Sequence, residues 1–332
     1  MARDQGAYSI SRRSFCWTLA GVLVAPGIAI AQASKVRRIG VLDNGAPDTP
    51  QGLRQADALR EFGWVEDQNL HVERRYDNGR SEAMQALAEE LVRAKVEIIV
   101  TLGSAATLAA KRATTAIPII FSVGDPVLLG LITSLARPGG NLTGISHASP
   151  EVTAKYLSVL KELLPGLQRI GVLWEVGHPY FRATRGQFEQ VYTSLGLVPI
   201  IVEVSATNQI SGAIAQLQRQ RAQALIVGIG SFTWDHRFEI VDAATKQGLP
   251  TMTDDQEFVR EAGALIAYTR SQVEHDRLLA EYIDRILRGA DPANLPVRQP
   301  TKFELVINLK TAKTLGLTIP KDLLLRADEV IQ

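Results

Sequence analysis

Cysteine is almost absent from this sequence, and neither its histidines nor its charges gather in a way that marks a function. Cys16 is the one cysteine among 332 residues, which excludes a disulfide framework and a thiolate metal cluster within one chain. The five histidines lie far apart, without a His-x-x-x-His pair or a His-Glu-x-x-His stretch, so the zinc-hydrolase motifs are missing. Lys and Arg number 36 against 35 Asp and Glu, which gives no general attraction to nucleic acid or an anionic membrane.

Several enzyme motifs are missing as well. Gly228-Ile229-Gly230 resembles the start of a dinucleotide-binding fingerprint, but position 233 is Thr where the third Gly would stand. The sequence has neither a phosphate-binding Gly-x-x-x-x-Gly-Lys-Ser/Thr loop nor a Gly-x-Ser-x-Gly nucleophile elbow. We therefore expect a protein that is not an enzyme and that uses no cofactor and no metal ion.

The first 33 residues have the pattern of an export signal. Arg12-Arg13 precede an apolar run at 18–30, and two small-x-small cleavage patterns end at Ala31 and Ala33. The run is shorter than the roughly 20 residues that span a bilayer, and paired arginines indicate a twin-arginine signal. We expect residues 1–33 to be a twin-arginine-type signal peptide, cleaved after Ala31 or Ala33, and the mature protein to be periplasmic. An uncleaved N-terminal anchor is the alternative.

The rest of the chain alternates between two patterns. Hydrophobic residues make up 46% and charged residues 21%, so the chain can bury a sizeable core, and its length suits two lobes. Short apolar, β-branched runs bounded by Gly, Pro or Asn are typical of strands buried on both faces of a parallel sheet. Such strands are expected at Arg38–Asp43, Glu97–Thr101, Ile117–Val123, Leu142–Ser146, Arg169–Trp174, Pro199–Val204, Ala224–Ile229, Leu265–Tyr268 and Phe303–Leu309.

Amphipathic stretches between these runs predict helices. The clearest are Ala83–Arg93, Glu151–Leu164 and Gln272–Arg288. Alternation of strands and helices at this spacing predicts doubly wound α/β lobes. The run Arg-Ile-Gly-Val-Leu occurs at 38–42 and again at 169–173, which marks where each of two similar lobes begins. We interpret 287–300 as a segment that crosses between them.

In open α/β sheets, ligands bind beyond the carboxyl ends of the strands, so residues that follow strands are the candidates. Gly103 leads from a strand into a helix, and the N–H groups at Ser104 and Ala105, with the helix dipole, suit a carboxylate or phosphate. Alternatively, Ser104 only caps this helix. Asn44 follows the first strand, where its amide could read a polar ligand or merely form a turn.

Asp125 follows the strand expected at 117–123. Its carboxylate could hold a ligand amine, and a neighbouring cation would keep it ionised. In the other interpretation Asp125 caps a helix whose first residue is Pro126. The two interpretations are compatible with each other.

Aromatic residues follow two strands in the second half of the chain. Trp174 ends one strand, and Ser231 and Trp234 follow another. Aromatic side chains exposed at such strand ends could stack on an aromatic or sugar ring of a ligand. Core packing is the alternative for each of them.

Five segments together resemble one known family. They are Gly63–Glu66, Ala136–Gly144, Gln299–Lys313, Leu315–Pro320 and Arg326–Ile331. From about residue 36 to the C-terminus, the chain resembles the substrate-binding proteins of ABC transporters, a family that includes tryptophan- and phenylalanine-binding members.

The resemblance implies a type I periplasmic-binding-protein fold. In that fold two α/β lobes with parallel-type sheets are joined by a three-strand hinge and close around a ligand. Lobe 1 would hold residues 34–147 and 271–296, and lobe 2 would hold 148–270 and 297–332. In family members that bind amino acids, lobe 1 mainly holds the ligand carboxylate and amine.

Site residues follow from the resemblance by position only. Ser104 and Thr107 fall in the family's Gly-x-x-Ala-Thr segment, and Asp125 falls in its Asp-Pro-Val segment. Trp174, Ser231 and Asp254 are the corresponding positions of lobe 2. The segment Thr253-Asp254-Asp255-Gln256 departs from the Tyr-plus-aromatic pattern of many members, and its two adjacent acids suit a ligand with extra donors or a positive charge.

The resulting hypothesis is a periplasmic receptor that captures a small polar solute, such as an amino acid, in the cleft between the lobes. Its partners would be this small-molecule ligand and an ABC permease of the inner membrane, without nucleic acid, and we expect a monomer. The main alternative is a ligand-sensing module that serves a membrane kinase or cyclase. An enzyme on the same scaffold is the third candidate.

Overall fold

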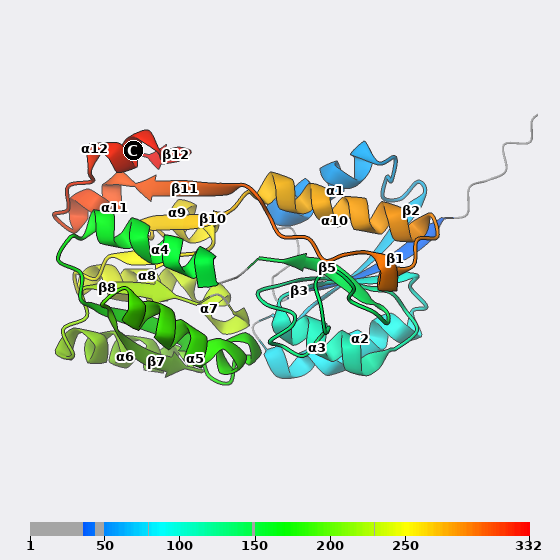
Figure 1. The fold of residues 1–332 in the computed structure, drawn as a ribbon, viewed down its shortest axis with the longest axis horizontal. Coiled ribbons are helices and arrows are strands. Elements are labelled where there is room, and N and C mark those ends of the chain that lie inside the picture. Colours follow the sequence, from blue (N-terminus) through cyan, green and yellow to red (C-terminus); the bar gives the residue numbers. More distant parts are fainter. Residues whose placement is uncertain (1–35, 44–49, 79, 148–149, 229) are drawn as a thin grey trace, which may run out of the picture. The chain divides into compact units, whose positions relative to one another are not determined.

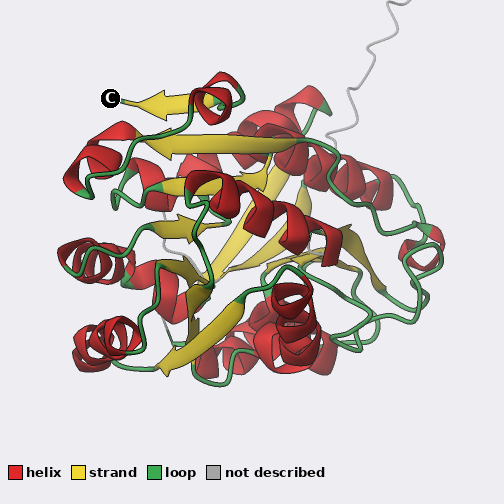
Figure 2. Cartoon of the chain, turned by 60° about the vertical axis from the view of Figure 1, so that its left-hand side comes forward, coloured by secondary structure: helices red, strands yellow, loops and turns green. Residues whose placement is uncertain are grey.

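A computed structural model describes residues 36–43, 50–78, 80–147, 150–228 and 230–332. Lys35–Gln332 form one compact unit, which contains two β-sheets with helices packed on both faces of each (Figures 1 and 2). The expected signal peptide at 1–33 lies outside the described residues, so it stays a prediction.

The first sheet contains five strands in the order β2-β1-β3-β4-β5, and all neighbours pair in parallel. These strands are β1 (Arg37–Asp43), β2 (Leu70–Tyr76), β3 (Ile98–Leu102), β4 (Ile119–Val123) and β5 (Leu142–Ser146). Because every residue of β3, β4 and β5 is buried, apolar β-branched side chains suit both faces of the sheet. We call this sheet with its helices lobe 1.

In the part of the chain that the structure describes, four helices cover the two faces of the first sheet. They are α1 (Pro50–Glu61), α2 (Met84–Arg93), α3 (Ser104–Ala113) and α10 (Gln272–Leu287), with a short 3₁₀ turn η1 at Ser81–Ala83 and another, η2, at Pro292–Asn294. Apolar side chains of α1 and α10 share one core cluster with β1 and β3, while those of α2 and α3 pack on the other face. Figure 1 shows α10 beside α1, although more than 200 residues separate them in sequence.

The second sheet contains seven strands in the order β12-β11-β10-β9-β8-β6-β7. They are β6 (Arg169–Glu175), β7 (Val198–Val204), β8 (Ala224–Val227), β9 (Thr251–Thr253), β10 (Ile266–Arg270), β11 (Phe303–Asn308) and β12 (Glu329–Ile331). All neighbours are parallel except β10 and β11, which pair antiparallel. The expected fold class, α/β lobes with parallel-type sheets, is confirmed.

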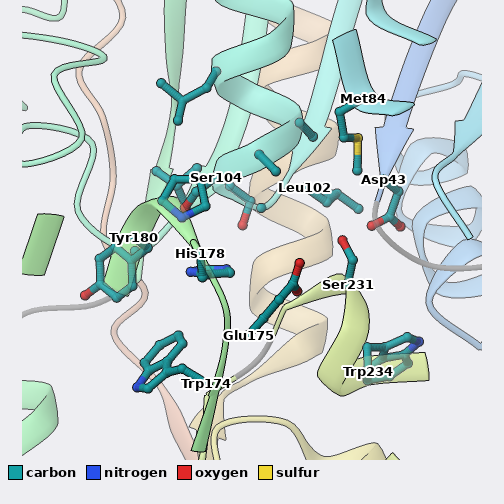
Figure 3. A pocket seen from close by; sticks show the side chains of 18 of the residues that line it. Asp43, Met84, Leu102, Ser104, Trp174, Glu175, His178, Tyr180, Ser231 and Trp234 are labelled. Carbon is teal, nitrogen blue, oxygen red and sulfur yellow. The ribbon is translucent and has the colours of Figure 1, made fainter. Parts of the chain in front are cut away.

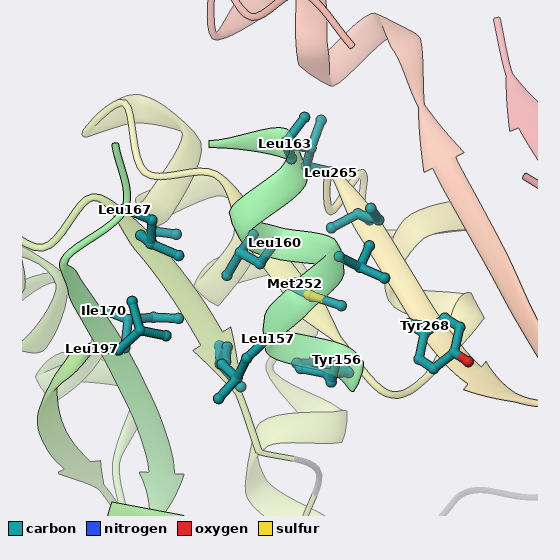
Figure 4. Close-up of a cluster of buried hydrophobic side chains, with 14 of the residues drawn as sticks. Tyr156, Leu157, Leu160, Leu163, Leu167, Ile170, Leu197, Met252, Leu265 and Tyr268 are labelled. Atoms are coloured by element: carbon teal, nitrogen blue, oxygen red, sulfur yellow. The ribbon is translucent and has the colours of Figure 1, made fainter. Parts of the chain in front are cut away.

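Among the described residues, eight helices accompany the second sheet, and we call this sheet with its helices lobe 2. They are α4 (Pro150–Leu163), α5 (Pro179–Ser194), α6 (Thr207–Arg219), α7 (Ser231–Asp235), α8 (Arg237–Lys246), α9 (Gln256–Arg260), α11 (Leu309–Thr314) and α12 (Lys321–Leu325). One core cluster joins α4 and α5 to the sheet (Figure 4), and another joins α6, α8 and α9 to the opposite face.

The chain crosses between the lobes three times, after β5, after β10 and before β11. The last crossing lies beside β5, where Ser146 N donates to Arg298 O at 2.9 Å and Arg298 N donates to Gly144 O at 3.0 Å. It is also tied to the start of α10, because Thr301 Oγ1 donates to Glu274 Oε1 at 2.7 Å. The lobe limits given above, 34–147 with 271–296 and 148–270 with 297–332, stay a prediction at their ends.

Three strands were not expected from the sequence. In β2, exposed or half-buried charged side chains such as Glu73 and Arg75 interrupt the apolar run, as on an edge strand with one solvated face. β9 and β12 have three residues each, too few to show a period. These two strands form because they pair with longer neighbouring strands, and the local sequence does not indicate that pairing.

Candidate functional site

A cavity of about 430 Å³, here called the interlobe cavity, lies where the carboxyl ends of the two sheets face each other (Figure 3). The first turn of α3 and the end of β4 line it from lobe 1. The ends of β6 and β10 and the starts of α5 and α7 line it from lobe 2. Strand ends of open α/β sheets are where such folds bind ligands, so this cavity is the candidate site.

The start of α3 lies at the cavity because Gly103 turns the chain sharply there. Gly103 is the N-cap, with φ of 92°, a conformation that strains residues with a Cβ. Ser104 and Ala105 line the cavity, and the first-turn N–H groups of a helix have no helical acceptor. The interpretation of Ser104 as a mere cap is therefore wrong, whereas its role in binding stays a prediction.

Two other residues expected in lobe 1 do not line the cavity or are not described. Thr107 is fully buried, and its hydroxyl donates to Gly103 O and lies 2.8 Å from Thr101 Oγ1. Its side chain therefore holds the turn between β3 and α3 from the protein interior. Asn44 lies outside the described residues, although its neighbour Asp43 does line the cavity.

Asp125 accepts backbone hydrogen bonds as a cap does, but the helix expected to begin at Pro126 is wrong, because 126–130 form turns instead. Its Oδ1 accepts hydrogen bonds from Val127 N at 2.9 Å and Leu128 N at 3.0 Å. Asp125 is not among the residues that line the interlobe cavity. The structure thus engages this carboxylate in the turn that follows β4, and a contact with the ligand amine has no support from its position.

Lobe 2 contributes an aromatic wall near the end of β6. The Trp174 ring stacks on Phe181, with centroids 4.8 Å apart and an interplanar angle of 17°. Its neighbour Glu175 is buried, and Glu175 Oε2 accepts a hydrogen bond from Phe232 N at 3.0 Å. Burial lowers the pKa of His178 to about 4, so this ring is neutral at pH 7. Core packing and cavity lining thus both hold for Trp174.

Described residues of the two lobes contact each other directly at the cavity. Ser231 Oγ, at the start of α7, donates to Asp77 Oδ2 of lobe 1 at 2.7 Å, and both residues are buried. Tyr180 of α5 covers Gly124 of lobe 1 so closely that a Cβ on Gly124 would lie 2.4 Å from the ring. These contacts show the lobes in a closed arrangement.

A pair of opposite charges lies at the carboxyl ends of two neighbouring strands of lobe 2. Asp254 follows β9, Arg270 ends β10, and the two strands pair in parallel. Both residues line the cavity, where Asp254 is exposed and Arg270 is half-buried. Burial raises the pKa of Asp254, and the Arg270 charge opposes that rise.

Sequence reasoning missed Arg270. The strand was expected to end at Tyr268, two residues earlier, because the apolar run ends there. Its charged side chain at the carboxyl end of a strand could have identified Arg270, because ligands bind at that end of the strands in open α/β sheets. The candidates after the other strands were chosen for the same reason.

A second cavity, of about 110 Å³, opens beside the first. The two share His147, Trp174, Tyr180, Asp254 and Arg270 as lining residues. We call it the aromatic chamber, because its other lining residues include Tyr156, Phe181, Phe188, Tyr192, Tyr268 and Phe303. Most of these come from helices and from strand interiors, which is why inspection of strand ends did not reveal them.

A buried chain of three hydrogen-bonded side chains, here called the relay, lies inside lobe 1 between β4 and α10. His275 Nε2 is 2.8 Å from Ser122 Oγ, and His275 Nδ1 is 3.2 Å from Asp276 Oδ1. Burial lowers the pKa of His275 to about 4, so the neutral ring donates from Nδ1 to the carboxylate and accepts from the serine. The order resembles a hydrolytic triad, but Ser122 is only 3% exposed and Asp276 also accepts from Arg54 Nε at 3.2 Å. The relay thus fixes the start of α10 against β4.

The described residues also bear on metal binding and membrane insertion. Within them, no group of three or more His, Cys, Asp or Glu residues is arranged to hold a metal ion. No helix among the described residues is long and apolar enough to cross a membrane.

Known proteins resemble this chain over most of its length. A tyrosine-binding protein of Clostridioides difficile strain R20291 is 24% identical over 265 residues, which cover 78% of this chain and 74% of that protein. A crystal structure of an ABC domain in complex with L-Trp from Streptococcus pneumonia is 26% identical, with a TM-score of 0.80, and covers 89% of this chain and 99% of that one. A conserved domain protein of Vibrio cholerae reaches a TM-score of 0.82 at 24% identity, covering 89% and 100%.

The family model for ABC transporter substrate binding proteins matches residues 43–331. That match covers both lobes and the three crossings, and the solved relatives share the two-lobed fold. The resemblance inferred from the sequence motifs is thus confirmed, and the chain belongs to the ABC transporter substrate binding protein family.

Proposed function

We propose that this protein is the periplasmic receptor of an ABC importer and that it binds an amino acid or a related small polar solute in the interlobe cavity. The observation that carries the proposal is a cavity enclosed by the carboxyl ends of both sheets, with cross-lobe contacts at its edge. A solute bound there would touch both lobes, and so would favour the closed arrangement over an open one.

The names of the relatives support an amino acid as the ligand. One relative is named as tyrosine-binding, and one solved structure contains L-Trp. In a receptor of this kind the closed, loaded form would be delivered to a permease of the inner membrane. We propose a monomer that acts without a covalent step.

Binding is tested with purified protein lacking residues 1–33. Each amino acid, with nucleobases and aromatic acids as further probes, is added in a thermal unfolding assay, and hits are measured by calorimetry. A true ligand raises the melting temperature, because binding to the native state adds RT ln(1 + [L]/Kd) to its stability. Small-angle scattering of the hit should show a smaller radius of gyration than the unliganded protein. No stabilisation by any probe would contradict the proposal.

Export is tested separately. The full chain, expressed with its first 33 residues, should be recovered from the periplasm with a new N-terminus at Gln32 or Ser34. Replacing Arg12 and Arg13 with Lys should retain the protein in the cytoplasm if the twin-arginine route is used. Recovery of the intact N-terminus in the membrane fraction would favour an anchor instead.

A further inference from the structure

Arg270 occupies the position in the molecule where the two cavities meet. It ends β10 and lines both the interlobe cavity and the aromatic chamber. It also lies directly before Ser271, the residue through which the chain crosses to α10. A group bound by Arg270 therefore contacts lobe 2 at the hinge side of the cavity.

Within the described ranges, the Arg270 guanidinium has no protein partner. Its Nε is enclosed and forms no hydrogen bond. The carboxylates of Asp255, Asp254 and Asp276 act on the guanidinium through their charge alone, without a hydrogen bond. Of the three nitrogens, only Nε is enclosed. The two terminal nitrogens are accessible, and Arg270 lines both cavities. A complete set of donors is thus directed at a site that a ligand could fill.

Such an arrangement is costly in the unliganded protein. A guanidinium stays charged at physiological pH. Arg270 is half-buried, and its enclosed Nε has lost water without gaining a protein partner, which is unfavourable. Burial lowers the pKa of Arg270, while Asp255 and Asp254 oppose that change from a distance. Asp255 Oδ1 accepts from Glu257 N at 2.8 Å, so its carboxylate is engaged in capping α9.

We propose that Arg270 binds the carboxylate of the ligand while the ligand's apolar group enters the aromatic chamber, so that the solute is a small amphipathic carboxylate. This inference rests on the proposed function and assigns the carboxylate to lobe 2, whereas the family resemblance placed it in lobe 1. A guanidinium presents a planar fork of N–H donors that matches the two oxygens of a carboxylate.

The size and lining of the chamber restrict the apolar group. An apolar cavity of about 150 Å³ binds benzene, and the chamber, at about 110 Å³, suits one six-membered ring or a branched aliphatic group better than a fused two-ring system. Its ring-rich wall offers edge and face contacts to an aromatic group. Trp174 and Tyr180 stand at the opening, where the two cavities join.

Asp254 completes the head-group site. Its carboxylate lines the cavity and is exposed there, and its own backbone N–H forms a hydrogen bond with it. A bound carboxylate alone would be repelled by this second anion. A solute that carries an ammonium or hydroxyl donor next to its carboxylate would satisfy Arg270 and Asp254 together.

The experiment is a calorimetric titration of the wild-type protein with four probes that differ by one group each. They are L-phenylalanine, 3-phenylpropionate without the amine, 2-phenylethylamine without the carboxylate, and L-alanine without the ring. We expect L-phenylalanine to bind most tightly and 2-phenylethylamine to bind roughly a hundredfold more weakly, as for loss of one partner of a buried charge pair. 3-Phenylpropionate and L-alanine should fall between them.

The same titrations are repeated with Arg270→Met, which keeps an unbranched apolar side chain as far as the Nε position and removes the charge and the N–H donors. Binding of L-phenylalanine should fall to the level of 2-phenylethylamine, while the binding of 2-phenylethylamine itself should not weaken. The unliganded variant should unfold at the wild-type temperature or above, because it lacks the unpaired charge. Arg169→Met is the matched control, since Arg169 starts β6 at the opposite edge of the same sheet, and it should bind as the wild type does.

The outcomes separate this inference from the proposed function. If 2-phenylethylamine binds within about threefold of L-phenylalanine, or if Arg270→Met binds L-phenylalanine as tightly as the wild type, the inference is overturned. If the wild type binds only a solute without a carboxylate, the inference also fails while the receptor function stands. If Arg270→Met does not fold, Arg270→Gln replaces it, and the wild-type series is decisive by itself.

Discussion

At the scale of single residues, position in the sequence and position in space gave different roles to Ser104 and Asp125. Both follow strands, and both were candidates for ligand contact and for capping. Ser104 lines the interlobe cavity and is not the N-cap, because Gly103 occupies that position. Asp125 caps a turn through two backbone N–H groups. The sequence alone could not tell a ligand contact from a cap at these two positions. For Ser104 the outcome depends on the positive φ of Gly103, which makes Gly103 the N-cap.

We expect Asp125→Ala to lower the free energy of unfolding by about 1 kcal/mol, the usual effect of losing such a cap, and to leave ligand affinity nearly unchanged. Urea unfolding and calorimetric titration measure the two quantities. Asp125→Asn is the control, since its side-chain oxygen still accepts hydrogen bonds and should retain most of the stability. A tenfold weaker affinity, about 1.4 kcal/mol, at unchanged stability would instead assign the carboxylate to the ligand.

At the scale of elements, α5 can pack against the segment after β4 because Gly124 has no side chain. Tyr180, in the first turn of α5, covers Gly124, where a Cβ would lie 2.4 Å from the ring. Gly124 is not held in a left-handed conformation, so its backbone can accept alanine, and the three atoms nearest the added Cβ all belong to Tyr180 of lobe 2.

Gly124→Ala should therefore oppose lobe closure without destabilising lobe 1. Overpacking costs about 1–3 kcal/mol, which corresponds to an affinity lower by about tenfold or more for the solute that the wild type binds most tightly. Adding Tyr180→Ala should restore part of the affinity by removing the ring. Gly212→Ala, on α6 where a Cβ would meet nothing, is the matched control. Equal affinities of Gly124→Ala and wild type would refute a closed ligand-bound arrangement with this contact.

The elements also show what a sequence can reveal about this fold. Strands β3, β4 and β5 were predictable because continuous apolar runs indicate burial on both faces. β2 was not, because its charged side chains make ion pairs at the sheet edge, such as Glu73 with Arg38 at 2.9 Å. The aromatic chamber was not predictable either, since it needs side chains from α4, α5, β10 and β11 at once.

At the scale of the whole molecule, buried neutral histidines link stability to pH. His275 is fully buried against Ser122 and Asp276, with Arg270 and Arg54 among the nearby charges. Burial lowers its pKa to about 4 from the ordinary 6.5, and burial does the same for His178. Between these two values the unfolded chain binds protons that the folded chain does not.

The free energy of unfolding should therefore fall as the pH falls from 6.5 to 4. A fully buried histidine with this shift contributes roughly 3 kcal/mol across that interval. Urea unfolding at pH 7, 5.5 and 4.5 measures the slope. In His275→Gln the slope should be shallower, although stability at pH 7 also drops. An identical slope in His275→Gln would contradict this assignment.

The three crossings have a consequence for how such receptors can be recombined. Because α10 packs on lobe 1 but is encoded after β10 of lobe 2, a single genetic crossover cannot exchange a lobe between two relatives. A chimera joined near residue 148 would receive the first sheet from one parent and the helix that covers it from the other. Exchanging a complete binding half needs three breakpoints, so new specificities should arise more readily by substitutions at the cavity than by swapping halves.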